Sequence, residues 1–279
     1  MNKHIQANRA YWDALTLIHV PSKFYDVEGF KRGRCTLSPT AIEELGDVTE
    51  RSLLHLQCHF GMDTMSWARR GAHVTGADFS KKAIAQARQL AKELSIPAEF
   101  VCSELSELPR RLSGQFDVVF TSEGVMAWLP DLRVWARVIA HFLKPGGVFY
   151  IHEFHPFVGV MDDEGAPDEP PRLCYPYFYS PKPMEFPAKG SGRGDTRYSG
   201  DYADPDAHVG QSSCEWFHNF SDIINSLIGA GLRIDFLNEF DWCTYQSCPF
   251  LKQGEDGMWR YPDAPESLPL MFSLKATKP

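Results

Sequence analysis

The sequence predicts an α/β protein with a mostly parallel sheet, helices on both faces, a helical N-terminal segment and a long insertion. Three observations lead to this prediction. Short apolar runs alternate with longer amphipathic stretches in the middle of the chain, which is typical of βαβ units. A stretch rich in proline and glycine then breaks the alternation, and two further apolar runs close the chain. We expect one domain, because 279 residues suit a single α/β unit.

The five central apolar runs are expected to form parallel strands. They are residues 52–57, 72–77, 98–102, 116–122 and 147–154. One helix is expected to begin at Gly61 and another after Ser80, whose side chain suits an N-cap. A third runs through residues 134–143 and ends before a Lys-Pro-Gly-Gly sequence. The first 50 residues carry further amphipathic stretches, so we expect a helical lid at 1–50 and a cofactor-binding core at 51–154.

The pattern changes at residues 155–215, which hold nine of the 20 prolines and seven of the 21 glycines. A connection this long is usually a lid or a binding loop. Its tyrosines and phenylalanines argue against plain disorder, so we expect a substrate cap. In the last part, 216–279, we expect a helix at 221–232 and an antiparallel pair of strands at 233–240 and 269–279.

Composition excludes several other classes of protein. The formal net charge of −8 shows no basic excess, so we expect no nucleic-acid partner. No run approaches the roughly 18 apolar residues of a spanning helix, and the N-terminus lacks a secretory apolar region. We therefore expect a cytoplasmic protein without membrane association. Seven cysteines without a Cys-x-x-Cys pair give little support to a disulfide framework or a zinc ribbon.

Ligands of open parallel sheets bind at the carboxyl ends of the strands, where the strand order reverses. The turn after the first run, LHLQCHFG, keeps only Gly61 of a glycine-rich fingerprint. Asp78 ends the second run, where a carboxylate can accept both hydroxyls of an adenosine ribose. Phe79 is placed to lie against an adenine ring, and Glu104 to accept from its amino group. The alternative is ordinary structure, with Asp78 a turn acid and Glu104 an acid at a helix N-terminus.

These motifs resemble those of class I S-adenosylmethionine (SAM)-dependent methyltransferases. HLQCHFG resembles a divergent form of the first motif, VTGADFS the second, FVCSE the third and FDVVFTSEGVMAWLPDL the fourth. HFLKPGGVFYIHEFHP resembles the stretch through the fifth strand. The resemblance covers residues 52–154 and the closing strands at 232–241 and 269–277. It implies a Rossmann-like, seven-stranded sheet with an antiparallel C-terminal strand.

The resemblance also implies that SAM is the cofactor and that its contacts come from the ends of these motifs. The expected cofactor contacts are Tyr25, His55, Gln57, His59, Gly61, Asp78, Phe79, Glu104, Leu105 and Glu123. The first turn departs from the family. His55 stands where the family usually has an acid, and Gln57 and His59 replace glycines. Side chains at the last two positions limit close approach of the backbone and offer new polar contacts.

Methyl transfer needs alignment, a pocket poor in water and, for some acceptors, a group that takes a proton. The fifth strand ends with His152, Glu153 and His155, and His218 follows the cap. We expect His155 and His218 to be the candidate general bases, because imidazole titrates near neutral pH. The alternative is that each histidine is a hydrogen-bonded structural residue.

Acceptor contacts are expected from residues near the cap. They are Trp128, Glu153, Tyr202 and Trp216. With Trp242 and Tyr245 these aromatic residues make either a pocket that also suits a cation or ordinary core packing. We expect no metal, because the histidine spacings match neither one helical face nor the two-residue period of a strand.

The sequence therefore predicts an enzyme that transfers a methyl group from SAM to a nitrogen or oxygen, less readily a sulfur, of a small molecule. A catalytically silent binding or regulatory protein is the first alternative, and the substituted first turn motivates it. A nicotinamide-dependent oxidoreductase is the second. It is disfavoured because the first turn lacks two of the three fingerprint glycines and because the chain ends in an antiparallel pair.

Overall fold

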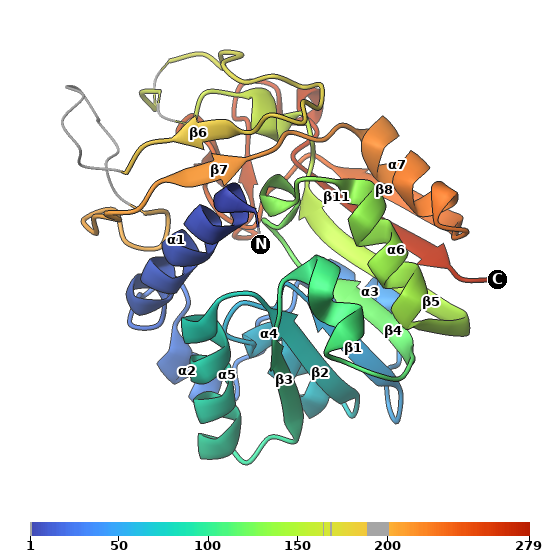
Figure 1. The fold of residues 1–279 in the computed structure, drawn as a ribbon. Coiled ribbons are helices and arrows are strands. Elements are labelled where there is room, and N and C mark those ends of the chain that lie inside the picture. Colours follow the sequence, from blue (N-terminus) through green and yellow to red (C-terminus); the bar gives the residue numbers. More distant parts are fainter. Residues whose placement is uncertain (1, 164, 168, 189–200) are drawn as a thin grey trace.

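The computed structural model describes residues 2–163, 165–167, 169–188 and 201–279. Its centre is a seven-stranded sheet with the strand order β3-β2-β1-β4-β5-β11-β8 (Figure 1). The strands are β1 (Ser52–Leu56), β2 (His73–Asp78), β3 (Ala98–Cys102), β4 (Phe116–Thr121), β5 (Leu143–Phe154), β8 (Arg233–Phe240) and β11 (Met271–Thr277). β1 to β5 pair in parallel, whereas β11 runs antiparallel to both β5 and β8. The predicted sheet is confirmed.

Helices cover both faces of this sheet, as predicted. α6 (Leu132–Phe142) and α7 (Phe220–Gly229) share a core with Leu54 and Leu56 of β1. Leu53 points to the opposite face, which is covered by the helices α3 (Pro39–Leu45), α4 (Met62–Arg69) and α5 (Lys81–Glu93). Successive side chains of a strand alternate between faces. A central strand buried on both sides is therefore apolar at nearly every position, and this is why the sequence shows continuous runs.

Side chains at the starts of two helices accept backbone hydrogen bonds. The hydroxyl of Ser80 accepts the backbone N–H of Ala83 and starts α5. α7 begins with a reciprocal pair in which the side chains of Asn219 and Asp222 accept each other's backbone N–H. The main difference is at β5, which begins at Leu143 rather than at the predicted residue 147.

The order of strands reverses between β1 and β4, so the loops that follow these two strands face each other. The side chain of Gln57, after β1, donates to the carbonyl of Val125, after β4, at 3.3 Å. This hydrogen bond joins the two loops at the carboxyl edge of the sheet.

The N-terminal segment is helical, as predicted, and lies across that edge. It forms α1 (Lys3–His19), α2 (Val27–Lys31) and α3. Figure 1 shows α1 beside α5 and next to the short strand β7 (Ser213–Glu215) of the cap. The carboxylate of Asp13 on α1 accepts from the hydroxyl of Ser80 at 2.7 Å and from the backbone N–H of Lys82 at 2.9 Å. α1 is thus tied to the start of α5.

The cap is built from two separate segments, and only the first was predicted. The described part of 155–215 contains η3 (Val158–Val160) and an antiparallel pair of β6 (Met184–Phe186) with β7. Residues 241–270, between β8 and β11, add β9 (Lys252–Gln253), β10 (Trp259–Arg260) and η4 (Pro265–Ser267). The two segments share one apolar core, in which Val160 and Met161 belong to the same cluster as Phe250 and Leu251.

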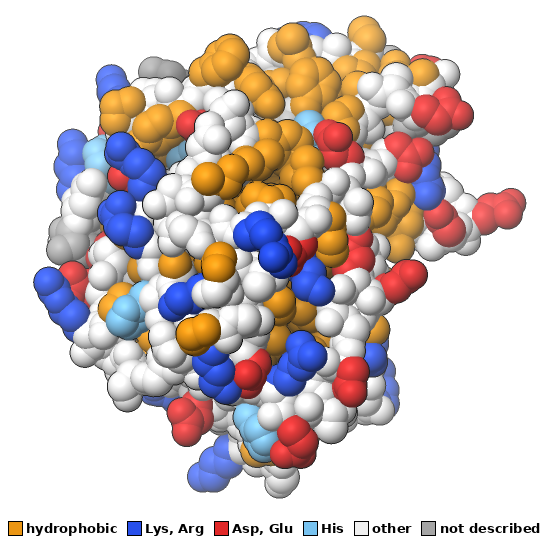
Figure 2. Space-filling view, turned by 90° about the vertical axis from the view of Figure 1, so that its right-hand side faces the viewer, with side chains coloured by type: hydrophobic (Ala, Val, Ile, Leu, Met, Phe, Trp, Pro, Cys, Tyr) orange, Lys and Arg blue, Asp and Glu red, His pale blue; other side chains and the backbone are white. Residues whose placement is uncertain are grey.

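The face that carries α7, β8 and the C-terminus shows both signs of charge, with hydrophobic side chains exposed between them (Figure 2). A basic stripe for a nucleic acid is not present on this face. Within the described residues, the helices are all too short or too polar to cross a membrane.

Candidate active site

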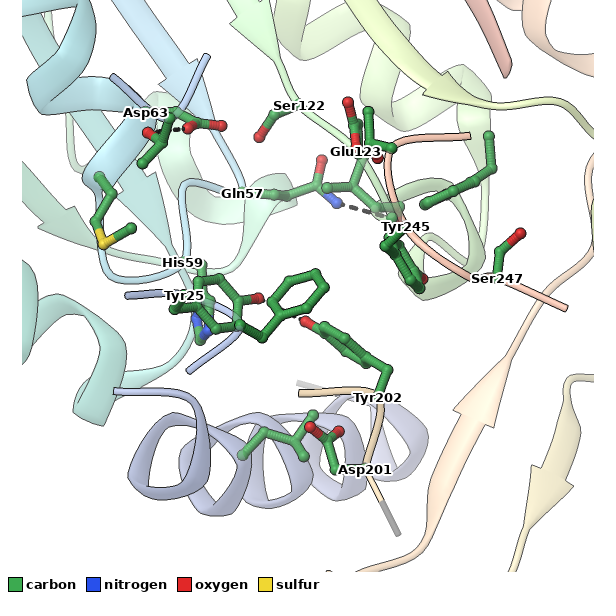
Figure 3. Close-up of a pocket in the computed structure, with 18 of the residues that line it drawn as sticks. Tyr25, Gln57, His59, Asp63, Ser122, Glu123, Asp201, Tyr202, Tyr245 and Ser247 are labelled. Carbon is green, nitrogen blue, oxygen red and sulfur yellow. Dashed lines mark hydrogen bonds between the residues drawn. The ribbon is translucent and has the colours of Figure 1, made fainter. Parts of the chain in front are cut away.

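A cavity of about 1400 Å³ opens at the carboxyl edge of the sheet (Figure 3). Its walls come from the N-terminal segment, the loops after β1, β2, β4 and β5, and both segments of the cap. Pockets for one drug-sized ligand usually measure roughly 300–1,000 Å³. This cavity therefore has room for a cofactor and a second small molecule. Nine of the predicted contacts line it, namely Tyr25, Gln57, His59, Gly61, Asp78, Phe79, Glu123, Trp128 and Tyr202.

The backbone of the turn after β1 has the conformation of a glycine-rich loop, although few of its residues are glycine. Gln57, His59 and Gly61 all have positive φ, at 57°, 49° and 77°. This left-handed conformation favours glycine, so the turn is strained at Gln57 and His59. Gly61 cannot be replaced easily, because a Cβ there would lie 2.5 Å from the ring of Phe100.

Asp78 fastens this turn to the sheet. One carboxylate oxygen accepts the backbone N–H of His59 at 2.9 Å, and the other accepts that of Ser80 at 2.8 Å. Burial raises the pKa of Asp78 to about 7. Phe79 follows it on the cavity wall, so the edge of β2 presents a carboxyl group and an aromatic ring together.

The two residues predicted to hold adenine, Glu104 and Leu105, do not line the cavity. The Glu104 carboxylate accepts from Ser106 at 3.0 Å, and Leu105 packs against the core under α6. α1 lies between this strand end and the cavity, since the guanidinium of Arg9 contacts the sulfur of Cys102 at the end of β3. The structure therefore does not bring the Glu104 carboxylate or the Leu105 backbone, the two groups expected at the adenine, to the wall of this cavity.

His55, expected from the sequence to contact the cofactor, also lies away from the cavity wall. Its ring is buried below the turn, with Nδ1 2.8 Å from the hydroxyl of Thr64 and Nε2 3.0 Å from that of Ser122. Burial lowers its pKa to about 3, so the ring is neutral at physiological pH. His55 joins β1 to α4 and to the loop after β4 and does not line the cavity.

The end of β5 presents a different histidine from those predicted. His152 is 1% exposed and lines the cavity, and its Nδ1 lies 2.8 Å from Oε1 of Glu123. A carboxylate accepts only, so the proton is on Nδ1 and Nε2 carries the lone pair. Nε2 has no hydrogen-bond partner among the described residues. The other Glu123 oxygen accepts the hydroxyl of Thr244 at 2.6 Å, which holds the pair in place from the cap.

The predicted bases His155 and His218 lie outside the cavity walls. The Nε2 of His155 lies 2.8 Å from Glu239, and its Nδ1 accepts the backbone N–H of Phe157 at 3.0 Å. The Nε2–H of His218 donates to the carbonyl of Leu129 at 2.7 Å. Burial lowers the pKa of both rings. Both rings thus make the hydrogen bonds that the structural alternative describes.

Glu153 and Trp216 also do not contact an acceptor in this cavity. The period of β5 turns Glu153 to the face opposite His152, where its carboxylate accepts four backbone N–H groups. These belong to Gly124, Val125, Met126 and Phe154, at 2.6–3.2 Å. Burial raises the pKa of Glu153 to about 7. Trp216 is buried behind the wall and donates to the carbonyl of Pro181 at 3.3 Å.

Aromatic rings from several segments form much of the remaining wall. The phenol oxygens of Tyr25 and Tyr202 lie 2.5 Å apart, joining the N-terminal segment to the cap. The Tyr245 ring stacks on Tyr202 at 5.5 Å, whereas Trp128 stacks on Tyr11 at 5.8 Å. Trp242, considered as a pocket residue from the sequence, does not line the cavity.

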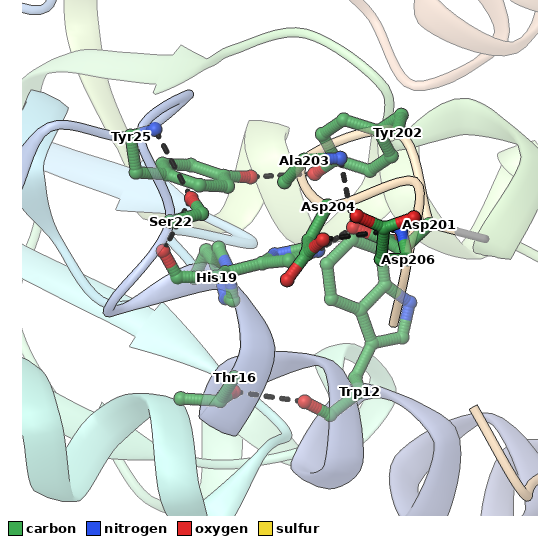
Figure 4. Close-up of polar contacts among 11 residues, drawn as sticks. Trp12, Thr16, His19, Ser22, Tyr25, Asp201, Tyr202, Ala203, Asp204 and Asp206 are labelled. Carbon is green, nitrogen blue, oxygen red and sulfur yellow. Dashed lines mark hydrogen bonds and ion pairs between the residues drawn. The ribbon is translucent and has the colours of Figure 1, made fainter. Parts of the chain in front are cut away.

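A chain of three side chains closes the cavity on the side of α1 (Figure 4). Nε2 of His19 lies 3.0 Å from the carboxylate of Asp201, and its Nδ1 lies 2.9 Å from Nε2 of His59. The chain joins the cap, α1 and the turn after β1. No local pattern could have revealed it, because the interacting residues are 182 and 40 positions apart.

Four buried polar atoms on cavity-lining residues have no hydrogen-bond partner among the described residues. They are Trp12 Nε1, Gln57 Oε1, His59 Nδ1 and His152 Nε2. Buried polar groups are usually paired, so this group of atoms suits a polar ligand. Across the described part of the chain, no three His, Cys, Asp or Glu side chains are grouped to hold a metal.

Comparison with known proteins agrees with this geometry. Residues 53–147 match the family model of a methyltransferase domain. The chain is 29% identical over 136 residues to the ubiquinone biosynthesis O-methyltransferase of Aeromonas salmonicida, and 32% identical over 136 residues to that of Escherichia coli O7:K1. Each match covers 47% of this chain. It covers 57% of the Aeromonas salmonicida protein and 56% of the Escherichia coli protein. The matched segment thus spans little more than half of these curated relatives.

Solved structures share the fold over a longer stretch. A SAM-dependent methyltransferase from Mesorhizobium loti is similar with a TM-score of 0.57 at 19% identity, covering 88% of this chain and 99% of that chain. The glycopeptide N-methyltransferase MtfA, solved with SAM, has a TM-score of 0.53 at 15% identity, and the match covers 86% of each chain.

Residues 53–147 of this chain therefore resemble a methyltransferase domain, and the fold around them is shared with solved SAM-dependent methyltransferases. The match favours a methyltransferase over the nicotinamide-dependent oxidoreductase considered from the sequence.

Proposed function

We propose that the protein transfers a methyl group from SAM to a nitrogen or oxygen of a small-molecule acceptor held in this cavity. The observation that carries the proposal is the position of His152. Its Nε2, buried and without a partner among the described residues, belongs to a residue that lines the same cavity as the turn at Gly61. A proton acceptor and a cofactor turn at one carboxyl edge are what methylation of a protonated nucleophile needs.

The residues present fit SAM. The unpaired atoms of Gln57 and His59 lie in the turn that would hold the methionine part, and Asp78 and Phe79 follow where a ribose and an adenine would be held. When bound, SAM supplies an electrophilic methyl group. Contacts from His55, Glu104 and Leu105 are not part of this proposal, because these residues do not line the cavity.

The chain's own residues orient the acceptor and take up its proton. Nε2 of His152 accepts a proton from the acceptor, and the Glu123 carboxylate stabilises the imidazolium that results. Thr244 holds Glu123 through its second oxygen. The aromatic walls and the cap exclude water from the cavity.

Calorimetry with SAM and with its demethylated product, S-adenosylhomocysteine (SAH), tests the cofactor part of the proposal. We expect both to bind, and no measurable binding of either would contradict it. Gly61→Ala provides a negative control, because φ is 77° and the new Cβ would meet Phe100 at 2.5 Å. Gly257→Ala is the matched variant, since Gly257 has φ of 81° with open space around it and does not line the cavity.

Turnover is tested with a panel of small amines, phenols, alcohols and thiols, with SAH formation as the readout. We expect SAH formation with members of the amine, phenol or alcohol groups. Tight binding of SAM without turnover on any of them would favour the alternative, a silent binding or regulatory protein. The small-molecule acceptor is supported by the size of the cavity, about 1400 Å³, of which SAM would fill only part.

A further inference from the structure

The charged side chains around the cavity are nearly all acidic. The lining includes seven carboxyl groups, those of Asp63, Asp78, Glu123, Asp163, Asp201, Asp206 and Glu215. Among the described lining residues, the single Lys or Arg is Arg34. Its Nε lies 3.2 Å from the carboxylate of Asp26, and its guanidinium also donates to the backbone of Tyr25, so it is already paired. An anionic molecule would thus find no free cation in this wall.

These acids come from three parts of the fold. Asp63 and Asp78 lie by the turn after β1, where the cofactor belongs. Glu123 lies on the other side, and Figure 3 shows it near Tyr245, away from Asp63 and His59. Asp163, Asp201, Asp206 and Glu215 come from the cap. Burial raises the pKa of Asp63 to about 6, and the charge of Glu123 acts in the same direction, as expected in a cavity short of positive charge.

Four aromatic rings are grouped around Tyr245, which Figure 3 shows near Glu123. The ring of Tyr245 lies 5.5 Å from Phe24, 5.4 Å from Phe154 and 5.5 Å from Tyr202, measured between ring centroids. The four residues come from the N-terminal segment, the end of β5 and the two segments of the cap, so the folded chain assembles them for this cavity. Aromatic faces attract cations, and they do so more strongly where water is excluded.

His152 is a third feature of this end, because it lines the cavity and its Nδ1 lies 2.8 Å from the Glu123 carboxylate. From these features together we infer that the acceptor is a small organic cation whose ammonium-type group lies between the aromatic rings of Phe24, Phe154, Tyr202 and Tyr245 and the Glu123 carboxylate. The inference rests on the proposed function and specifies its substrate class.

The test uses three probes of similar size and different charge: 2-phenylethylamine, 2-phenylethanol and 3-phenylpropanoate. Each is titrated calorimetrically into the full-length protein saturated with SAH, whose neutral sulfur keeps the cofactor's own charge out of the measurement. We expect the amine to bind at least about tenfold more tightly than the alcohol, and the carboxylate to bind most weakly.

Three variants test which side chains cause the preference for the amine. Glu123→Gln and Tyr245→Leu are each expected to reduce the preference for the amine at least about threefold. Tyr245 is not among the expected cofactor contacts, so Tyr245→Leu should also leave the affinity for SAH unchanged. Glu255→Gln makes the same change of charge at an exposed residue that does not line the cavity, and should leave the preference as it is. An equal fall in Glu255→Gln would mean that net charge alone explains the preference, and would overturn the inference.

The inference is also overturned if the amine binds no more tightly than the alcohol, if the carboxylate binds best, or if none of the three binds at about 10 mM. The same titrations without SAH separate this result from the proposed function. Failure of SAH to bind contradicts the proposed function, whereas the preference for the amine is still measured directly in the SAH-free protein.

Discussion

Nδ1 of His152 lies 2.8 Å from Oε1 of Glu123, although the two residues are 29 positions apart in the chain. They come from the ends of β5 and β4, which are neighbours in the sheet and run in parallel. The carboxyl ends of neighbouring parallel strands meet at one edge, so the pair follows from strand order. The contact sets the proton on Nδ1 and leaves Nε2 with a lone pair.

We expect His152→Gln to lower kcat by about 10²–10⁴-fold, the usual contribution of a general base. The acid limb of the pH profile of kcat/KM should disappear with the ring. Glu123→Gln should keep that limb but lower the rate by about tenfold, because the imidazolium then lacks its carboxylate partner. The measurement is a rate profile from pH 5.5 to 9 with an acceptor identified by the panel.

His155→Ala and His218→Ala are the controls for this profile. Both remove a buried hydrogen-bonded ring, so we expect each to lower the free energy of unfolding by about 1–3 kcal/mol and leave the profile unchanged. Loss of the acid limb in either control, or its retention in His152→Gln, would contradict the assignment.

Asp78→Ala should weaken SAM binding by about 1–3 kcal/mol, the cost of leaving hydrogen-bonding groups without a partner. The variant also removes the acceptor of the His59 and Ser80 backbone N–H groups, so calorimetry must be paired with a melting curve. Asp78→Asn keeps the shape of the side chain and one of the two acceptor oxygens, so it removes one of these backbone hydrogen bonds instead of both. Unchanged affinity in a folded Asp78→Ala variant would show that the ribose is held elsewhere.

Glu153 predicts a pH dependence of stability. Its pKa is about 7 in the folded protein against 4.5 for the free group, because burial disfavours the charge. The protonated form is therefore favoured by folding. Its contribution is complete below about pH 4.5 and is lost as the pH rises through about 7. Between pH 5 and pH 8 the urea midpoint should fall more steeply for the wild type than for Glu153→Gln. If the midpoints of the two proteins fall equally with pH, Glu153 is not the cause of the pH dependence.

The chain from Asp201 through His19 to His59 predicts that the cap and the cofactor turn are coupled. Asp201→Ala leaves the buried Nε2 of His19 without its acceptor, so we expect SAH affinity to fall by about 1–2 kcal/mol and proteolysis of the cap to speed up. Asp204→Ala is the matched control. Asp204 belongs to the same cap turn, and its carboxylate accepts the backbone N–H of Asp206 at 3.1 Å. The same losses in both variants would argue against coupling through His19.

The local elements of this protein were readable from the sequence. The five central runs, the cap of α5 at Ser80 and the start of a helix at Gly61 depend on residues close together in the chain. The alternation of strands and helices also predicted that the sheet is parallel. These properties suffice to place Asp78 and Phe79 on the wall of the cavity.

Tertiary structure alone decided which polar groups face the cavity. His152, Glu153 and His155 are nearly adjacent, and only the packing of β5 between β4 and β11 selects His152 for the cavity wall. The second segment of the cap and the contact between Asp201 and His19 join parts of the chain that no local pattern relates. Short-range periodicity records which side of an element is apolar, whereas the direction of a polar side chain is set by neighbours that are brought close only when the chain folds.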